Sequence, residues 1–431
     1  MNAATTRSLS GYVDARRERL VAILTDLVRI PSENRAPAGA ELACQLYLAD
    51  RLQRAGWDPT LYTPDEVPGI TDHPVYWPGR DYERRPNLGS TYPGDGGGRS
   101  LILSGHIDTV PAGSLPWTHA PFGAEIAGGR LYGRGAFDMK AGIASNVFVV
   151  EALAELGFRL YGDLTFESVV DEEFGGVNGT LAGRLAGYTA DAAILSEPSN
   201  LRICPAQRGG RTVHVSFTAP NGGILCPADS AGVIEQLRLF LNALPQLAEV
   251  RRLAAPEHIL YAHLADRVPV TVARIHTAPW TTDEPPNVPP LCRLEIFWQA
   301  MPGETVEAID RQFNVWLDAL VAANPQTFNV RPTIEHPIRW LPGSALAPDH
   351  PLVREFATTA QSATGQLPKV CGIEGPCDMY VFHDFGIPAL LWGPRGGNAH
   401  MPDEYVEIDS LVESTKALLT FVCQWCGVAS E

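Results

Sequence analysis

Several side chains that could bind a metal ion or move a proton follow short apolar segments or Gly-rich turns. His106 and Asp108 come directly after the segment "LILSG", two residues apart. In extended backbone their side chains point to the same side, so one can bind a metal ion while the other holds the histidine ring. Further residues of these types in comparable positions are Asp138, Glu172, Glu173, Glu197 and His400.

Each of these residues has an ordinary explanation when it is taken alone, because a single histidine after a strand or a short acidic run is usually a polar surface position. As a group they predict a metal site. Four carboxylates in one place, with no run of Lys or Arg nearby in the sequence, repel one another strongly unless cations bind. Two divalent ions would offset this charge. Histidine and carboxylate ligands without thiolates suit Zn²⁺, with Co²⁺ and Mn²⁺ as alternatives.

The elements that must position these residues are short apolar strands that alternate with helices. This alternation predicts an α/β domain with a mostly parallel sheet flanked by helices. In such sheets ligands bind outside the carboxyl ends of the strands, where nearly all the candidate residues fall. The expected strands are 101–105, 164–170, 192–196 and 388–394.

The middle of the chain has a different order of elements. It predicts strand, helix, two strands, helix and strand, which suits a ferredoxin-like α+β domain inserted into the larger one. We therefore expect the catalytic domain in two parts, 1–208 and 331–431, with the inserted domain at 209–330. The six inserted elements are expected at 211–219, 229–244, 268–276, 291–299, 305–323 and 328–334.

Helices and one long loop complete the expected organisation. Amphipathic spacing predicts helices at 20–28 and 41–56, and a last helix that opens with a capping box from Ser410 to Glu413. Residues 63–99 are rich in Pro, Gly, Asp and Tyr and carry little periodicity. They predict a long surface excursion, and long loops in compact domains are often functional.

The composition excludes several classes of protein. The 33 Lys and Arg against 49 Asp and Glu give a formal charge of −16, which argues against binding nucleic acid through phosphates. No run of about 18 apolar residues occurs, and the first residues lack the apolar core of a signal peptide. We expect a cytoplasmic protein without membrane contact. Cys423 and Cys426 lie in an apolar run and are expected to be buried thiols, because no second pair is nearby.

Five segments occur in a recognisable order: "SGHIDTVPAG", "GRLYGRGAFDMKAG", "DEEFGG", "SEP" and "GPRGGNAHMPDEYVEI". Together they resemble the signature set of the M20 family of metallopeptidases and amidohydrolases. This family includes acetylornithine deacetylase, succinyl-diaminopimelate desuccinylase, aminoacylase and glutamate carboxypeptidases. The resemblance covers nearly the whole chain. It implies a zinc-peptidase-like catalytic domain, with the inserted domain acting as a lid and as the contact of a homodimer.

The resemblance also implies a ligand set for two metal ions. Asp138 would bridge the ions. His106 and Glu197 would complete one site, and Glu173 and His400 the other.

Two catalytic roles and one backbone feature follow from the same resemblance. Glu172 would be the general base that activates a metal-bound water, and Asp108 would orient the ring of His106. The peptide bond between Asp138 and Met139 would be cis.

The inserted domain departs from the family pattern at two positions. Cys226 falls where many members have a histidine that steadies the oxyanion, and Gln299 falls where an arginine is usual. Asn287 still fits the lid asparagine of the family. Arg395 could bind a substrate carboxylate or could equally be a turn residue. Other histidines of the inserted domain could take the place of the missing one, namely His214, His258, His263 and His276. For these four, exposed or structural roles are the simpler explanation.

These observations predict a dinuclear metallohydrolase that cleaves the amide bond of a small N-acylated amino acid or a similar N-acyl amine. One alternative within the class is an exopeptidase that acts on dipeptides or on a C-terminal residue. An alternative from another class is a metal-retaining binding protein with a degenerate lid. The intact set of ligands and base argues against this last alternative.

Overall fold

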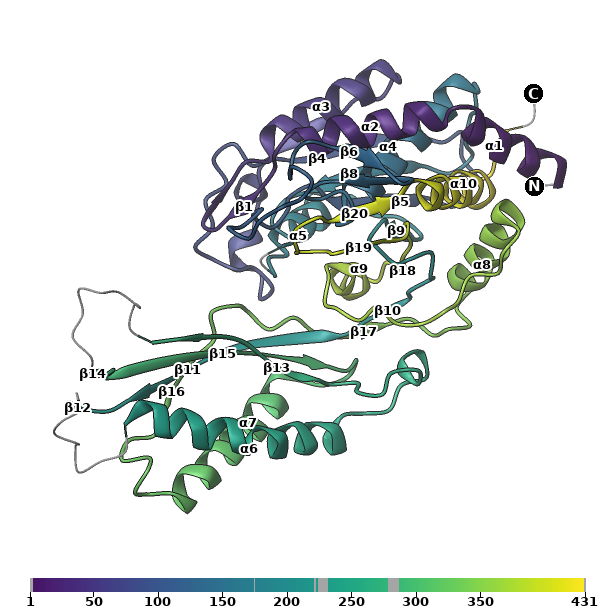
Figure 1. Cartoon of the computed structure of the whole chain (residues 1–431). Coiled ribbons are helices and arrows are strands. Elements are labelled where there is room, and N and C mark those ends of the chain that lie inside the picture. Colours follow the sequence, from purple (N-terminus) through teal and green to yellow (C-terminus); the bar gives the residue numbers. More distant parts are fainter. Residues whose placement is uncertain (1–2, 174, 221, 224–231, 278–286, 430–431) are drawn as a thin grey trace. The chain divides into compact units, whose positions relative to one another are not determined.

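The computed structural model describes residues 3–173, 175–220, 222–223, 232–277 and 287–429 of the 431-residue chain (Figure 1). The chain forms two compact units. The large unit contains Met1–Ala206, Ala345–Ile373 and Cys377–Glu431, and the small unit contains Gln207–Ser344 and Glu374–Pro376. The two-residue strands β10 (Ala206–Gln207) and β17 (Ser344–Ala345) lie where the chain passes from one unit to the other.

The large unit is built on a six-stranded sheet with the strand order β18, β9, β5, β8, β4, β3. The first four strands are parallel, and β4 and β3 add an antiparallel edge. The strands β5 and β8 are buried along their whole length, as expected for a sheet covered on both faces. In sheet order the strand bounds are Ala389–Leu391, Ala193–Leu195, Leu101–His106, Leu164–Val169, Asn87–Tyr92 and Thr60–Tyr62.

Alternating side chains of this sheet pack into two separate hydrophobic cores. Leu101 and Leu103 of β5 belong to the larger core, whereas Ile102 belongs to a smaller one on the other face. In Figure 1 the helices α2, α3 and α4 lie over one face of the sheet, and residues of all three belong to the larger core. It is closed by α1 (Ala3–Ala15), α2 (Arg17–Arg29), α3 (Leu42–Arg54), α4 (Lys140–Glu155), α8 (Pro351–Thr364) and α10 (Ile408–Trp425).

The remaining elements of the large unit are short. The helix α9 (Met379–Asp384) packs on the smaller core, and α5 (Asn178–Leu185) follows the loop after β8. A second sheet has the order β19, β20, β7, β6, with bounds Gly396–Gly397, Tyr405–Glu407, Arg130–Tyr132 and Glu125–Ala127. The other short pieces are β1 (Asn34–Arg35), β2 (Ala38–Gly39), η1 (Pro64–Glu66) and η2 (Ile70–Asp72).

The structure corrects two expectations for the large unit. The helix α1 was not predicted, although Leu9 and Val13 on one of its faces are buried in the core. The predicted capping box is wrong, because α10 begins at Ile408 directly after β20. Ser410 therefore lies inside the helix, where its hydroxyl donates to the carbonyl of Glu407 at 2.7 Å.

The small unit has the expected strand and helix order. Its antiparallel sheet has the order β13, β15, β11, β16, and α6 and α7 contribute to the same hydrophobic core. The bounds are β11 Gly209–Thr218, α6 Val233–Ala254, β13 Val270–His276, β15 Leu291–Ala300, α7 Val306–Ala323 and β16 Thr333–Glu335. Also present are β12 (Gly222–Gly223), β14 (Asn287–Val288) and η3 (Ile259–Tyr261).

Two bounds in the small unit differ from the expectation. The helix α6 continues through Pro245 to Ala254, because Leu247 and Arg251 extend its buried face. The unit also extends to Ser344, beyond the boundary expected at 330, because β16 pairs with β11 and Leu341 forms a β-bridge with Gly210. Among the described residues, no helix is both long and apolar enough to span a membrane.

Candidate metal centre

The sheet of the large unit brings several candidate residues to one edge. His106 is the last residue of β5, Glu172 and Glu173 follow β8, and Glu197 follows β9. Since β8, β5 and β9 are neighbouring parallel strands, their carboxyl ends lie side by side.

Asp138 and His400 come from loops of the second sheet. Asp138 lies between β7 and α4, and its peptide bond to Met139 is cis. His400 lies between β19 and β20, in the left-handed region with φ 62°. Because β20 pairs with β7 and with β19, the second sheet holds both loops together.

Asp138 contacts a different histidine with each of its two oxygens. Its Oδ1 lies 3.3 Å from His106 Nε2, and its Oδ2 lies 3.3 Å from His400 Nε2. Glu173 Oε2 lies 2.9 Å from His400 Nε2, and Glu197 Oε2 lies 3.8 Å from His106 Nε2. The structure thus brings together all five residues expected to bind metal.

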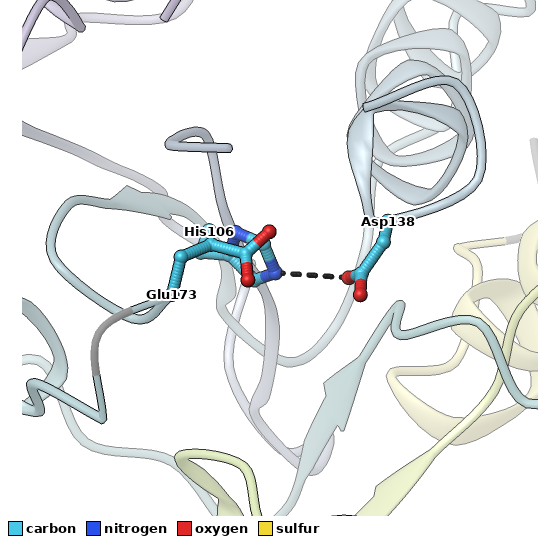
Figure 2. A group of neighbouring side chains, drawn as sticks. All are labelled: His106, Asp138 and Glu173. Carbon is cyan, nitrogen blue, oxygen red and sulfur yellow. Dashed lines mark hydrogen bonds and ion pairs between the residues drawn. The ribbon is translucent and has the colours of Figure 1, made fainter. Parts of the chain in front are cut away.

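Three members of this group, His106, Asp138 and Glu173, each offer one ligand atom within 4.8 Å of the others (Figure 2). The His106 side chain is 1% exposed, whereas that of His400 is 51% exposed. One side of the group is therefore buried and the other reaches solvent. Glu172 Oε2 lies 3.8 Å from His106 Nε2 and joins the group on its buried side.

Asp108 acts differently from the expectation. The ring of His106 is held by the backbone carbonyl of Asp108, which lies 2.9 Å from Nδ1, whereas the carboxylate is 3.6 Å away. The carboxylate instead accepts hydrogen bonds from the backbone N–H groups of Glu172 at 3.2 Å and Glu173 at 3.1 Å. Asp108 therefore fixes the turn that carries these two glutamates.

Glu404 is a residue that the sequence reasoning missed. Its buried carboxylate accepts from the backbone N–H groups of Gly135 at 3.1 Å, Phe137 at 2.9 Å and Asp138 at 3.0 Å. It also forms an ion pair with Arg134 at 2.5 Å. Glu404 thus clamps the Asp138 loop from the loop that carries His400. No signal in the sequence distinguished it from the other acidic residues of "MPDEYVEI".

Asp378 was also missed. It is buried, and it accepts a hydrogen bond from the hydroxyl of Thr180 at 2.6 Å. Its negative charge helps to raise the pKa values of Glu172 and Glu197. The sequence signal that could have identified Asp378 is its charge within the otherwise apolar run "CDMYVF".

The electrostatics of the group favour a bound cation. Burial raises the pKa of Glu172 well above its ordinary value and that of Glu197 to about 8, because a carboxylate loses hydration and neighbouring carboxylates repel it. The charge of Glu173 raises the pKa of His400 to about 11, although burial opposes this shift. Burial alone would raise the pKa of Asp138, but hydrogen bonds from His106 and His400 lower it.

The donor set fits a divalent metal ion. The ion pairs given by the described residues join these carboxylates to two histidines, so that the negative charge is only partly balanced. Imidazole nitrogens and carboxylate oxygens are ligands for Zn²⁺ and similar ions. The raised pKa values of Glu197 and His400 favour bound protons in the metal-free group, and divalent ions would replace these protons.

Other candidate residues are not joined to this group by the described contacts. Arg395 donates to Glu413 at 3.0 Å and lies 3.6 Å from Glu407, which favours a structural role. Asn287 lies in β14 of the small unit, and Gln299 lies in β15, where its carbonyl accepts from Arg251. Cys226 lies outside the described residues.

The alternative histidines and the C-x-x-C pair have ordinary surroundings. His214 lies 2.9 Å from Glu295, and the His258 side chain accepts from the backbone N–H of Leu260. His276 is at the end of β13, and His263 follows η3. Cys423 and Cys426 are free and buried, as predicted. None of these residues changes the assignment of the centre.

A cluster of histidines and carboxylates at the carboxyl ends of a largely parallel sheet fits the class of proteins with a metal-binding site at the sheet edge. The model of peptidase family M20/M25/M40 matches residues 102–424. The chain belongs to this family, whose members hydrolyse amide or peptide bonds.

Similar proteins include two curated relatives and one solved structure. N-formyl-4-amino-5-aminomethyl-2-methylpyrimidine deformylase of Halalkalibacterium halodurans is 28% identical, over 97% of both chains. Succinyl-diaminopimelate desuccinylase of Rhodospirillum centenum is 28% identical, over 94% of this chain and 97% of the relative. The dipeptidase Dug1p of Saccharomyces cerevisiae is 15% identical with a TM-score of 0.78, over 100% of both chains, and so shares the fold.

Proposed function

We propose that this protein is a dinuclear metal-dependent deacylase that hydrolyses the amide bond of a small N-acyl amine or N-acylated amino acid. The observation that carries the proposal is the position of Asp138, whose two oxygens each face a different histidine. A carboxylate placed in this way suits a bridge between two ions. The names of the deformylase and desuccinylase relatives support removal of an acyl group.

The proposed metal ligands divide into two sets that share Asp138. His106 and Glu197 would hold one ion, and His400 and Glu173 the other. The three carboxylates bring a charge of −3 against +4 from two divalent ions, and the excess positive charge suits an oxyanion. Zn²⁺ is the proposed metal, with Co²⁺ or Mn²⁺ as alternatives. When bound, such ions lower the pKa of water and polarise a carbonyl group.

Glu172 is the proposed general base. Its carboxylate is 14% exposed and lies beside the ligand His106, and its pKa is raised mainly by burial. A base with a pKa closer to neutrality accepts a proton from the attacking water and still returns it to the leaving amine. The backbone N–H of Glu172 donates to Asp108, which fixes the turn that presents the base.

Metal analysis together with a substrate screen tests the proposal. We expect two divalent ions per chain and faster turnover of formyl-, acetyl- or succinyl-amides than of dipeptides. Faster turnover of dipeptides would support an exopeptidase instead. Two bound ions without turnover of any amide would support a binding protein. Light scattering on the same sample tests the homodimer that we also propose.

A further inference from the structure

The long segment between β3 and β4 sends three polar side chains into the interior of the large unit. Arg80, Tyr82 and Arg85 belong to the stretch that was expected to be a surface excursion. The side chain of Arg80 is 4% exposed, Tyr82 is 2% exposed, and the side chain of Arg85 is fully buried. The segment is therefore packed into the unit at these positions.

The three side chains converge on Asp171, the residue before the proposed base. The hydroxyl of Tyr82 donates to Asp171 Oδ2 at 2.9 Å. Arg80 Nε lies 3.4 Å from the same oxygen, and Arg85 Nη2 lies 3.4 Å from Oδ1. The Asp171 side chain is fully buried, so these contacts replace its hydration.

Asp171 occupies a turn that has little freedom. Its φ of 72° lies in the left-handed region, which few residues other than Gly, Asn and Asp adopt readily. A Cβ atom at Gly176 would collide with the carbonyl and the carboxylate of Asp171. The backbone of the turn therefore packs directly against Gly176. A shift of Asp171 would move the residues that follow it.

Asn34 connects Asp171 to the metal centre. Its side-chain amide donates to Asp171 Oδ1 at 3.1 Å and to Asp108 Oδ2 at 2.9 Å. Asp108 in turn accepts from the backbone N–H groups of Glu172 and Glu173. The turn is thus held from both sides by a continuous set of hydrogen bonds.

The guanidinium group of Arg85 is also held by partners other than Asp171. It forms a buried ion pair with Glu41 at 2.7 Å and donates to the carbonyl of Pro37. A buried ion pair contributes little net stability, because desolvation of the charges offsets their attraction. Hydrogen bonds with fixed directions do hold groups in one geometry. The network is therefore better suited to positioning than to stabilisation.

We propose that Arg80, Tyr82 and Arg85 are positioning residues for the proposed base, acting through Asp171. They hold Asp171 so that Glu172 points at the substrate amide and Glu173 at the metal. This inference rests on the proposed function, because it assigns Glu172 as the base. It gives the long segment a role in the rate of the reaction.

The test compares Tyr82→Phe and Asp171→Asn with the control Tyr62→Phe. Asn tolerates the left-handed turn, so Asp171→Asn removes charge with little backbone strain. Tyr62 is a partly buried tyrosine at the start of the same segment, and its hydroxyl accepts from Asn87 at 3.4 Å. The measurements are kcat, KM, metal content, thermal unfolding and the visible absorption spectrum of the Co²⁺ form.

We expect Tyr82→Phe and Asp171→Asn to lower kcat by roughly 10-fold to 100-fold with unchanged KM and two ions bound, because small misplacements of catalytic groups are costly. The Co²⁺ spectrum should also change, since Glu173 lies in the same turn. Tyr62→Phe should match the wild type in every measurement. Wild-type kcat and spectrum in Tyr82→Phe would overturn the inference, as would a loss of stability alone.

Glu172→Gln separates this inference from the proposed function. If the wild type hydrolyses an amide and Glu172→Gln does not, the function stands and Tyr82→Phe decides the positioning role. If the wild type hydrolyses no amide, the proposed function fails. If the wild type hydrolyses an amide and Glu172→Gln keeps wild-type turnover, the deacylase function stands but Glu172 is not the base. The Co²⁺ spectra of Tyr82→Phe, Asp171→Asn and Tyr62→Phe then decide whether the network positions the turn.

Discussion

The two units of the chain hold their buried charges in different ways. In the small unit, Arg251 pairs with Glu304 at 2.7 Å, with side chains that are 1% and 7% exposed. Arg211 pairs with Asp310 at 2.6 Å. Each of these carboxylates is paired with an arginine side chain, which stays positively charged. In the large unit, the carboxylates at the strand ends share two histidines.

The difference is also visible within the large unit. Glu167 lies in β8, a few residues before the metal centre, and it forms a fully buried ion pair with Arg184. Glu404 pairs with Arg134. Among the described residues, partly balanced negative charge gathers around the strand ends of the large unit, where Glu172, Glu173 and Glu197 lie and to which Asp378 adds. Charges such as Glu167 and Glu404 are paired with an arginine of the chain, whereas the carboxylates of the candidate metal centre are left for a cation from solution to balance.

The largest effect is expected for Asp138→Asn. Loss of the shared carboxylate should reduce the metal content below two ions and lower kcat/KM roughly 1000-fold or more, because each ion contributes several kcal/mol of charge stabilisation. Atomic absorption and steady-state kinetics measure both quantities. Asp191→Asn is the matched control, since Asp191 is exposed near the opposite end of β9 and accepts from Ser100. Two tightly bound ions in Asp138→Asn would contradict the shared-ligand assignment.

Glu172→Gln should have the next largest effect. The amide side chain keeps the shape of the glutamate but accepts no proton, so kcat should fall by about 10²-fold to 10⁴-fold. Metal content should stay at two ions, which separates a base from a ligand. Turnover near the wild-type level would refute the role of Glu172 as the base.

Metal affinity should rise with pH. The raised pKa values of His400, about 11, and Glu197, about 8, mean that the metal-free centre holds protons at neutral pH. These protons must leave when ions bind, so affinity should increase about tenfold per pH unit for each proton displaced. Competition with a chelator between about pH 6 and pH 8 measures the slope. Affinity that does not change with pH would show that the centre is already deprotonated.

The smallest effect on the metal centre is expected for Glu304→Gln in the small unit. This change leaves the buried charge of Arg251 without its partner and should destabilise the protein by about 3 kcal/mol. Metal content should be unchanged. Glu235→Gln, in an exposed pair with Arg238, should alter neither property. Loss of metal in Glu304→Gln would contradict the distinction between arginine-paired carboxylates, which support the fold, and the carboxylates of the metal centre.

Much of the fold followed from the sequence. Apolar runs such as 101–105 and 164–170 predicted the central strands, because side chains buried on both faces leave a continuous apolar pattern. Helix ends were predicted less well. The start of α10 and the passage of α6 through Pro245 depend on packing, which outweighs local signals. The helix α1 was missed for the same reason, since its N-terminal half is polar.

By itself the sequence determined the types of chemical group and their places at the ends of strands. Residues adjacent in sequence to a strand end must lie at that edge of the sheet, which is why His106, Glu173 and Glu197 were found. Only the tertiary structure decided that Asp138 faces two histidines, that Asp108 holds backbone amides, and that the segment after β3 reaches Asp171. These contacts join residues far apart in the chain, and their existence depends on how separate elements pack together.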